Sequence, residues 1–180
     1  MPNAYATVAE AQIYFDTRLH ETAWSLSSAT DQQNSLYAAT AIIDRLAYKG
    51  VKKAVNDAFL ADTDLESNFD SGDAAALATV AAAEASQAME FPRGTDTNIP
   101  NAILVACYEI AYSLLDGVDP DLEMENLAIQ RHSIGGTTTV YDRSQEAPQH
   151  IVNGVPSATA WRNLRPYLRD GDHIRIMRVS

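Results

Sequence analysis

The pattern of apolar and polar positions predicts a chain built mainly of α-helices. Near the start, Thr7 and Glu10 have the spacing of a capping box, in which each side chain accepts from the other residue's backbone amide. A helix should follow to about Leu19, and its aromatic residues provide an apolar face. The first predicted element is therefore an amphipathic helix with a defined beginning.

A second helix is predicted over residues 31–49, with capping at Thr30 and Gly50 as the residue that ends it. Apolar or small residues recur on one side of it at helical spacing, at Leu36, Thr40, Ile43 and Ala47. Asp44 lies beside this stripe. This helix should pack against the protein core.

The middle of the chain is an alanine-rich stretch over residues 51–90. Residues 51–60 are compatible with a short helix, and residues 61–73 have the composition of an acidic loop. Asp73 can cap an alanine-rich helix over residues 74–89, whose small side chains permit close packing.

A loop that contains Phe91, Pro92 and Arg93 precedes the most apolar predicted helix. Pro100 suits the first helical position because the amide it lacks would be unpaired there. Apolar residues continue at helical spacing to Leu115, so this helix is expected to be central. A shorter helix is expected over residues 121–128.

Beyond this point the composition changes. Residues 137–141 are rich in threonine and valine, which favours a β-strand, and a short helix from residue 158 is interrupted by Pro166. Residues 174–179 alternate between apolar residues and arginine, which is a strand pattern. The pattern thus predicts a mainly α protein: a compact bundle of about four to five helices (residues 1–128), with a short β element and an extended C-terminal arm (residues 129–180).

Charge divides the chain in the same place. The net charge is −11 over 180 residues, yet residues 129–180 carry +3 (seven arginines, four acids) and leave −14 for residues 1–128. Nucleic-acid affinity needs clustered cations, which the body lacks, whereas the arm could bind an acidic partner or bind DNA weakly. The first residues have no basic and leucine-rich run, and there is no apolar run of membrane-spanning length, so we expect neither a signal peptide nor a membrane partner. The single cysteine fits a reducing compartment.

Residues with chemical potential are few. The acidic residues from Asp62 to Asp73 approach the spacing of a calcium loop, but Ser67 replaces its required glycine and Asp73 its final glutamate. The four histidines lack zinc-site spacing, and Cys107 lies within an apolar helix face, where a thiol is usually inert. We therefore expect no cofactor, no metal and no enzymatic activity.

The arm holds the strongest candidates for binding. Arginine, tryptophan and tyrosine are enriched in the energetic centres of interfaces, and they gather here. The candidate partner-binding residues are Trp161, Arg162, Arg165, Tyr167, Arg169, Ile174, Arg175, Ile176 and Arg178. Three of these arginines lie three or four residues apart, so a helix would place them on one face, although a solvated helix face would have the same composition.

Four segments in order carry a family resemblance. These are the run from Tyr5 into the first helix, Ala39-Thr40-Ala41-Ile42-Ile43-Asp44, the Phe-Pro-Arg loop, and the Ile99-Pro100 helix start with Ala106 and Glu109. Together, over residues 5–115, the chain resembles a phage family labelled DnaT-like single-stranded-DNA-binding proteins, whose members look like head–tail connectors, or adaptors, of tailed phages. The alanine-rich stretch looks longer than is usual in that family, and the segment after Ser133 matches nothing known to us.

The resemblance implies two alternative functions. One is a structural ring, often of twelve copies, that joins the portal protein to the tail or its terminator in the virion neck, after assembly in the host cytoplasm. The other is single-stranded-DNA binding in replication. Such binders use a cationic groove with stacking aromatic residues, whereas a channel that lets double-stranded DNA slide should avoid phosphate contacts. An acidic body favours the adaptor.

In an adaptor the arm would dock on another protein, either by adding residues 174–179 to a partner's sheet or by seating its arginine helix in a portal groove. Arg93 is expected to pair with a carboxylate, within the fold or on the next subunit of the ring. Asp44 is expected to have a structural or subunit-interface role.

Overall fold

The computed structural model describes residues 3–128, 131–134, 137–140 and 148–169. In these ranges the helices are α1 (Val8–Phe15), α2 (Thr22–Ser25), α3 (Ala29–Asp44), α4 (Lys53–Ala61), α5 (Leu65–Asp70), α6 (Ala74–Ser86), α7 (Asn101–Leu115), α8 (Pro120–Ala128), α9 (Gln149–Val152) and α10 (Ala158–Leu164). A 3₁₀ turn, η1 (Arg165–Tyr167), follows α10. The mainly helical fold is confirmed. The helices outnumber the predicted four to five because several are single turns.

Local capping signals explain where several helices begin. Thr7 and Glu10 form the complete capping box of α1, and the Asp73 carboxylate accepts from two amides at the start of α6. The predicted cap at Thr30 is wrong, because Ser28 caps α3 by accepting from the Asp31 amide. Helix α3 also ends at Asp44, before the predicted residue 49.

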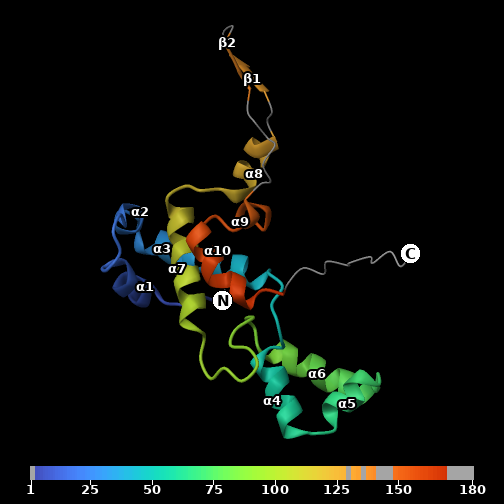
Figure 1. Ribbon diagram of the computed structural model, residues 1–180. Coiled ribbons are helices and arrows are strands. Elements are labelled where there is room, and N and C mark those ends of the chain that lie inside the picture. The colour runs from blue at the N-terminus through green and yellow to red at the C-terminus, as the bar shows by residue number, and fades with distance from the viewer. Residues whose placement is uncertain (1–2, 129–130, 135–136, 141–147, 170–180) are drawn as a thin grey trace, which may run out of the picture.

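Helix α7 is the centre of the main core and contacts α2, α3 and α10 (Figure 1). Two of its three alanines, Ala106 and Ala111, are fully buried, which lets the neighbouring helices approach closely. Phe15 and Trp24 stack at 4.5 Å beside this helix. The core therefore forms around the helix that the sequence identifies as most apolar.

One ion pair is enclosed in this core. Glu109 of α7 accepts from Arg18 Nε (2.8 Å), Arg18 Nη2 (3.0 Å) and the Tyr14 hydroxyl (2.7 Å). The Arg18 guanidinium also lies 4.0 Å from the centre of the Tyr112 ring. Burial, aided by the bond to Glu109, raises the pKa of Tyr14 to about 12. Both Glu109 oxygens are thus paired, so a structural role accounts for this carboxylate.

Helices α4, α5 and α6 form a separate lobe on one side of the main core (Figure 1). Its own small apolar cluster consists of Val55, Leu65, Ala76 and Val80, with Phe59 and Phe69 packed against it. The prediction that residues 61–73 form a loop is therefore wrong in part, because Leu65 is buried in this cluster and residues 65–70 are helical. The alanine-rich stretch is a small helical lobe.

The predicted extended arm is wrong for residues 148–169. Helix α10 packs on α7, and Val155, Ala160 and Leu164 are fully buried members of the main core. The backbone continues alongside the segment that follows α3, since Lys49 N donates to Tyr167 O (2.9 Å) and Arg169 N donates to Ala47 O (2.9 Å). Burial of these apolar side chains outweighs the polar composition that suggested an arm.

Between α8 and α9 the chain forms a β-hairpin that extends away from the helices (Figure 1). Strand β1 (Arg131–Ile134) pairs with β2 (Thr137–Val140) in antiparallel register, with Ile134 opposite Thr137, and this sheet has only these two strands. The hairpin and the lobe lie at opposite ends of the core.

Across the described ranges, no single helix is both long and apolar enough to cross a membrane, although the bent pair Asn101–Leu115 and Pro120–Leu127 passes that test when taken together.

Replacing Leu164 by alanine tests whether residues 148–169 belong to the core. We expect the free energy of unfolding to fall by about 2–5 kcal/mol, because the change removes a fully buried side chain and leaves a cavity. Urea unfolding measures this. The matched control is Leu122→Ala on α8, where the side chain is 54% exposed and the expected change is within about 0.5 kcal/mol. Equal effects of the two variants would contradict the packing.

Candidate functional site

The Phe-Pro-Arg loop lies where four segments of the chain meet. The Phe91 ring is 1% exposed and makes edge-to-face contacts with Tyr5 (6.2 Å), Tyr48 (4.7 Å) and Tyr167 (5.7 Å between ring centres). These tyrosines come from the N-terminal segment, the segment after α3, and η1. Such aromatic contacts add to the free energy of simple burial. Phe91 therefore fixes the loop to the core.

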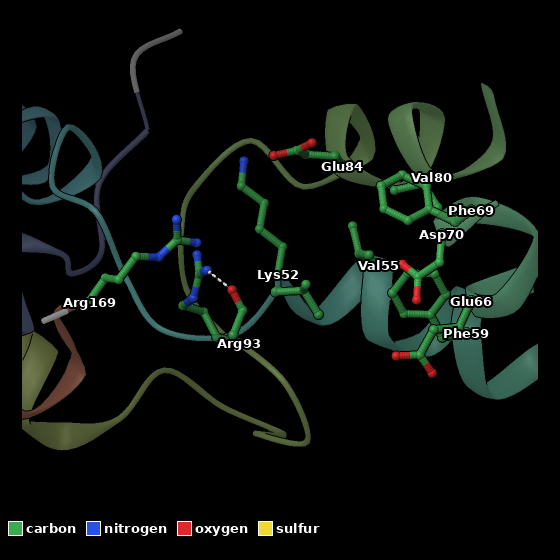
Figure 2. Close-up of a pocket in the computed structure, with 12 residues that line it drawn as sticks. Lys52, Val55, Phe59, Glu66, Phe69, Asp70, Val80, Glu84, Arg93 and Arg169 are labelled. Carbon is green, nitrogen blue, oxygen red and sulfur yellow. Dashed lines mark hydrogen bonds between the residues drawn. The ribbon is translucent and has the colours of Figure 1, made fainter. Parts of the chain in front are cut away.

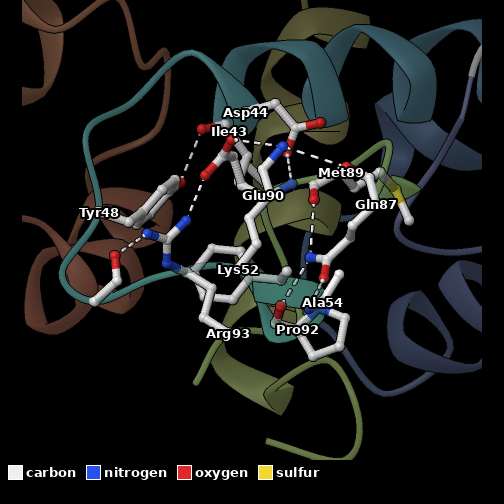
Figure 3. Close-up of polar contacts among 12 residues, drawn as sticks. Ile43, Asp44, Tyr48, Lys52, Ala54, Gln87, Met89, Glu90, Pro92 and Arg93 are labelled. Carbon is white, nitrogen blue, oxygen red and sulfur yellow. Dashed lines mark hydrogen bonds and ion pairs between the residues drawn. The ribbon is translucent and has the colours of Figure 1, made fainter. Parts of the chain in front are cut away.

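Arg93 joins this loop to the segment between α3 and α4 (Figure 3). Its guanidinium pairs with the Glu90 carboxylate and donates to the carbonyls of Lys49 and Gly50. Lys52 Nζ lies 3.3 Å from the other Glu90 oxygen. One carboxylate thus holds two cations, and the partner of Arg93 is in its own chain.

Asp44 is a second acceptor in this network. Its Oδ1 accepts from the Tyr5 hydroxyl and from the Glu90 amide (3.1 Å), and the Tyr5 oxygen in turn accepts from the Phe91 amide (3.3 Å). Burial raises the pKa of the Asp44 carboxyl above its usual value, although these hydrogen bonds oppose the rise. Asp44 connects the end of α3 to the loop and has a structural role in this chain.

Gln87 connects the loop to the lobe. Its amide nitrogen donates to Met89 O (3.0 Å) and Pro92 O (2.8 Å), and its oxygen accepts from Ala54 N (3.1 Å) (Figure 3). The Lys53 amide also donates to Pro92 O (3.1 Å). Both ends of the lobe, residue 53 and residue 87, are therefore tied to the same loop.

A groove of about 420 Å³ lies where the lobe meets the core (Figure 2). Its apolar surface comes from the lobe, through Val55, Phe59, Phe69 and Val80. Its cations and its carboxylates come from different parts of the chain. Lys52, Arg93 and Arg169 lie toward the core, and Glu66, Asp70 and Glu84 project from α5 and α6. A groove that combines apolar side chains with charged groups of both signs can contact a polypeptide segment. We take this groove and the loop beneath it as the candidate site.

The predicted partner-binding residues differ in their exposure and location. Trp161 is half-buried against the core and Tyr167 contacts Phe91, whereas Arg162, Arg165 and Arg169 are exposed. The three arginines do not share one helix, because α10 ends at Leu164 and Pro166 lies in the 3₁₀ turn that follows. Of these residues only Arg169 lines the groove. The candidates Ile174, Arg175, Ile176 and Arg178 lie outside the described residues.

The described residues contain few candidate metal ligands or nucleophiles. Residues 3–128 and 148–169 contain no group of three or more His, Cys, Asp or Glu residues that could hold a metal ion. Burial raises the pKa of Cys107 to about 12, so this thiol stays protonated near neutral pH.

No protein-family model, curated protein or solved structure matches this chain. The function must therefore be inferred from the site and the surface.

Sequence reasoning singled out Arg93 and Asp44 but missed Lys52, Glu90, Gln87 and the groove. The groove residues come from segments between residues 50 and 93 and from residue 169, and no spacing rule brings these together. One signal was available for part of the site: Glu90 and Arg93 lie three residues apart at the predicted loop and carry opposite charges.

Replacing Arg93 by lysine tests the role of its forked guanidinium. A lysine keeps the charge but cannot reach Glu90 and two carbonyls together, so we expect a loss of about 1–3 kcal/mol in the free energy of unfolding. The control is Arg162→Lys on the exposed face of α10, with an expected change within about 0.5 kcal/mol. Chemical unfolding of both variants measures the difference, and a neutral Arg93→Lys would refute the role.

Asp44→Asn tests the buried carboxyl through pH. A raised pKa in the folded state means that ionisation of Asp44 opposes folding, and asparagine mimics the protonated form. The stability of the wild type relative to the variant should therefore fall as pH rises from below 3.8, the ordinary pKa of the group, through the raised value. Unfolding free energies of both proteins between about pH 3 and pH 7 measure this. A stability difference that increases with pH would show that hydrogen bonding outweighs burial.

Proposed function

We propose that this protein is a structural head–tail adaptor of a tailed bacteriophage. Copies of it form a ring, dodecameric in our proposal, between the portal protein and the tail or its terminator, and double-stranded DNA passes through without specific binding. The protein would assemble in the host cytoplasm and remain in the neck of the virion. The resemblance of residues 5–115 to that phage family motivates the proposal.

The observation that carries it is the distribution of exposed apolar side chains. Leu19 and Leu26, beside α1 and α2, are each 82% exposed, and Leu60 and Leu77 are exposed on the lobe. These two sets lie on different parts of the molecule (Figure 1). A closed ring needs two different surfaces that meet between successive subunits. The α1–α2 edge and the lobe are our candidates for these surfaces.

The hairpin supports an assembly role as well. A two-stranded sheet is marginally stable alone in water, and β1 pairs only with β2 in the described part of the chain. Contact with a neighbouring subunit or with the portal protein would stabilise it.

The alternative, single-stranded-DNA binding, requires exposed aromatic rings beside free cations. The rings of Tyr5, Tyr48 and Tyr167 instead pack against the buried Phe91, and Lys52 and Arg93 pair with Glu90. With a net charge of −14 over residues 1–128, these contacts favour the adaptor.

The ring proposal is tested by changing the α1–α2 edge. In the variant Leu19→Glu/Leu26→Glu, subunit association, alone or with the portal protein of the same phage, should weaken by at least about tenfold, because each change places a charge in an apolar contact. Native mass spectrometry measures assembly. Both side chains are exposed, so the thermal unfolding temperature should be unchanged. The control is Leu122→Glu on α8, and equal assembly of the two variants would refute this interface.

Oligonucleotide binding tests the alternative. We expect a single-stranded thirty-nucleotide DNA to bind more weakly than about 0.1 mM at 0.15 M salt. Fluorescence anisotropy measures this. Tight, salt-dependent binding by a monomer would instead favour the replication function.

A further inference from the structure

The groove between the lobe and the core has an order of charge along it (Figure 2). Arg169, Arg93 and Lys52 lie at the core side. The phenyl rings of Phe59 and Phe69 lie farther along, next to Glu66 and Asp70. A peptide segment that binds along this groove should therefore carry acidic residues where it passes the core side. It should carry basic and apolar residues where it passes Phe59 and Phe69.

The lobe side of the groove is incompletely paired. Glu66, Asp70 and Glu84 are exposed, and within the described residues none of them makes an ion pair. The rings of Phe59 and Phe69 are only half-buried. The two carboxylates of Glu66 and Asp70 beside partly exposed phenyl rings form a surface that complements a segment with arginine and aliphatic residues (Figure 2).

This chain contains such a segment directly after the groove. Residue 169 lines the groove, and the sequence continues Asp-Gly-Asp-His and then Ile-Arg-Ile-Met-Arg-Val over residues 170–179. The acids come first and the arginines follow, in the same order as their complements along the groove. We propose that residues 174–179 dock in this groove of their own chain, where the long side chains of Arg175 and Arg178, which leave an extended backbone on different sides, each reach a carboxylate of α5.

Chain length favours docking within one molecule. Four residues, 170–173, can span about 13 Å when extended, which carries residue 174 from Arg169 into the groove. A segment tethered this closely has an effective concentration in the millimolar range, so a second molecule at micromolar concentration competes poorly.

The consequence is a tail that is held before any partner arrives. Arg175 and Arg178 belong to the segment for which the sequence suggests partner binding, and the lobe would mask them. A partner that binds this segment must displace it from Glu66 and Asp70, and this competition sets a threshold for binding. The proposal concerns the free chain and stands whether or not the protein forms a ring.

Backbone order parameters from ¹⁵N relaxation of the full chain test the docking. For residues 174–179 we expect values near those of a rigid backbone, about 0.8, at both low and high protein concentration. The variants Glu66→Arg/Asp70→Arg and Arg175→Glu/Arg178→Glu should each lower them below about 0.6. Combining all four changes should restore the higher value, because the charges are then exchanged. The methyl resonances of Val55 and Val80 should shift in the two double variants and recover in the combination.

The control variant is Glu123→Arg/Glu125→Arg on α8, where both carboxylates are exposed and outside the groove, and it should leave the tail ordered. Values below about 0.6 for the wild-type tail would overturn the proposal. Order that appears only at high protein concentration would also overturn it, because docking would then occur between molecules. If the order parameters of residues 174–179 stay low in the variant that combines all four changes, the proposed pairing of Arg175 and Arg178 with Glu66 and Asp70 is wrong.

Discussion

Burial of Phe91 is the constraint on which the arrangement of the whole chain depends. Its ring contacts tyrosines from the N-terminal segment, the segment after α3, and η1. The same loop carries Arg93 and Glu90, which connect it to the segment before α4. The buried Phe91 ring and the Arg93 guanidinium fix the loop on the core, and the hydrogen bonds of Gln87 and of the Lys53 amide then hold the lobe to that loop.

Local signals predicted much of the helical architecture. Capping by Thr7 and Asp73, and the proline before α7, depend on residues within one turn, so the sequence is enough to place these helix starts. The end of α3 and the existence of α5 were missed, because they depend on tertiary contacts such as the burial of Leu65 among residues from other helices. Propensity alone cannot supply that information.

The C-terminal region shows more clearly where prediction from the sequence fails. Its arginines and polar residues suggested an arm, yet Val155, Ala160 and Leu164 are sufficiently apolar to bring residues 148–169 into the core. In the candidate site, Arg93 was foreseen as the partner of a carboxylate, but Glu90 could not be chosen among the many acids of the body. The groove could not be predicted from the sequence, because residue 169 approaches residues 50–93 only in the folded chain.

Surface chemistry and architecture give a consistent interpretation. The carboxylates of Glu109 and Asp44 are hydrogen-bonded within the fold and have structural roles. Among the exposed apolar side chains, Leu19 and Leu26 lie beside α1 and α2, and Leu60 and Leu77 lie on the lobe. An acidic body with such edges suits a subunit that contacts copies of itself and does not hold DNA. In our proposal, the charged groove holds the C-terminal segment of the same chain until a partner binds that segment.

The central claim is that copies of this chain close into a ring with an open channel. Electron microscopy of the purified protein, alone and with the portal protein of the same phage, tests it most directly. The account predicts closed rings with a central channel lined by acidic or neutral side chains. Compact monomers under both conditions, with single-stranded DNA bound along a cationic surface, would contradict it.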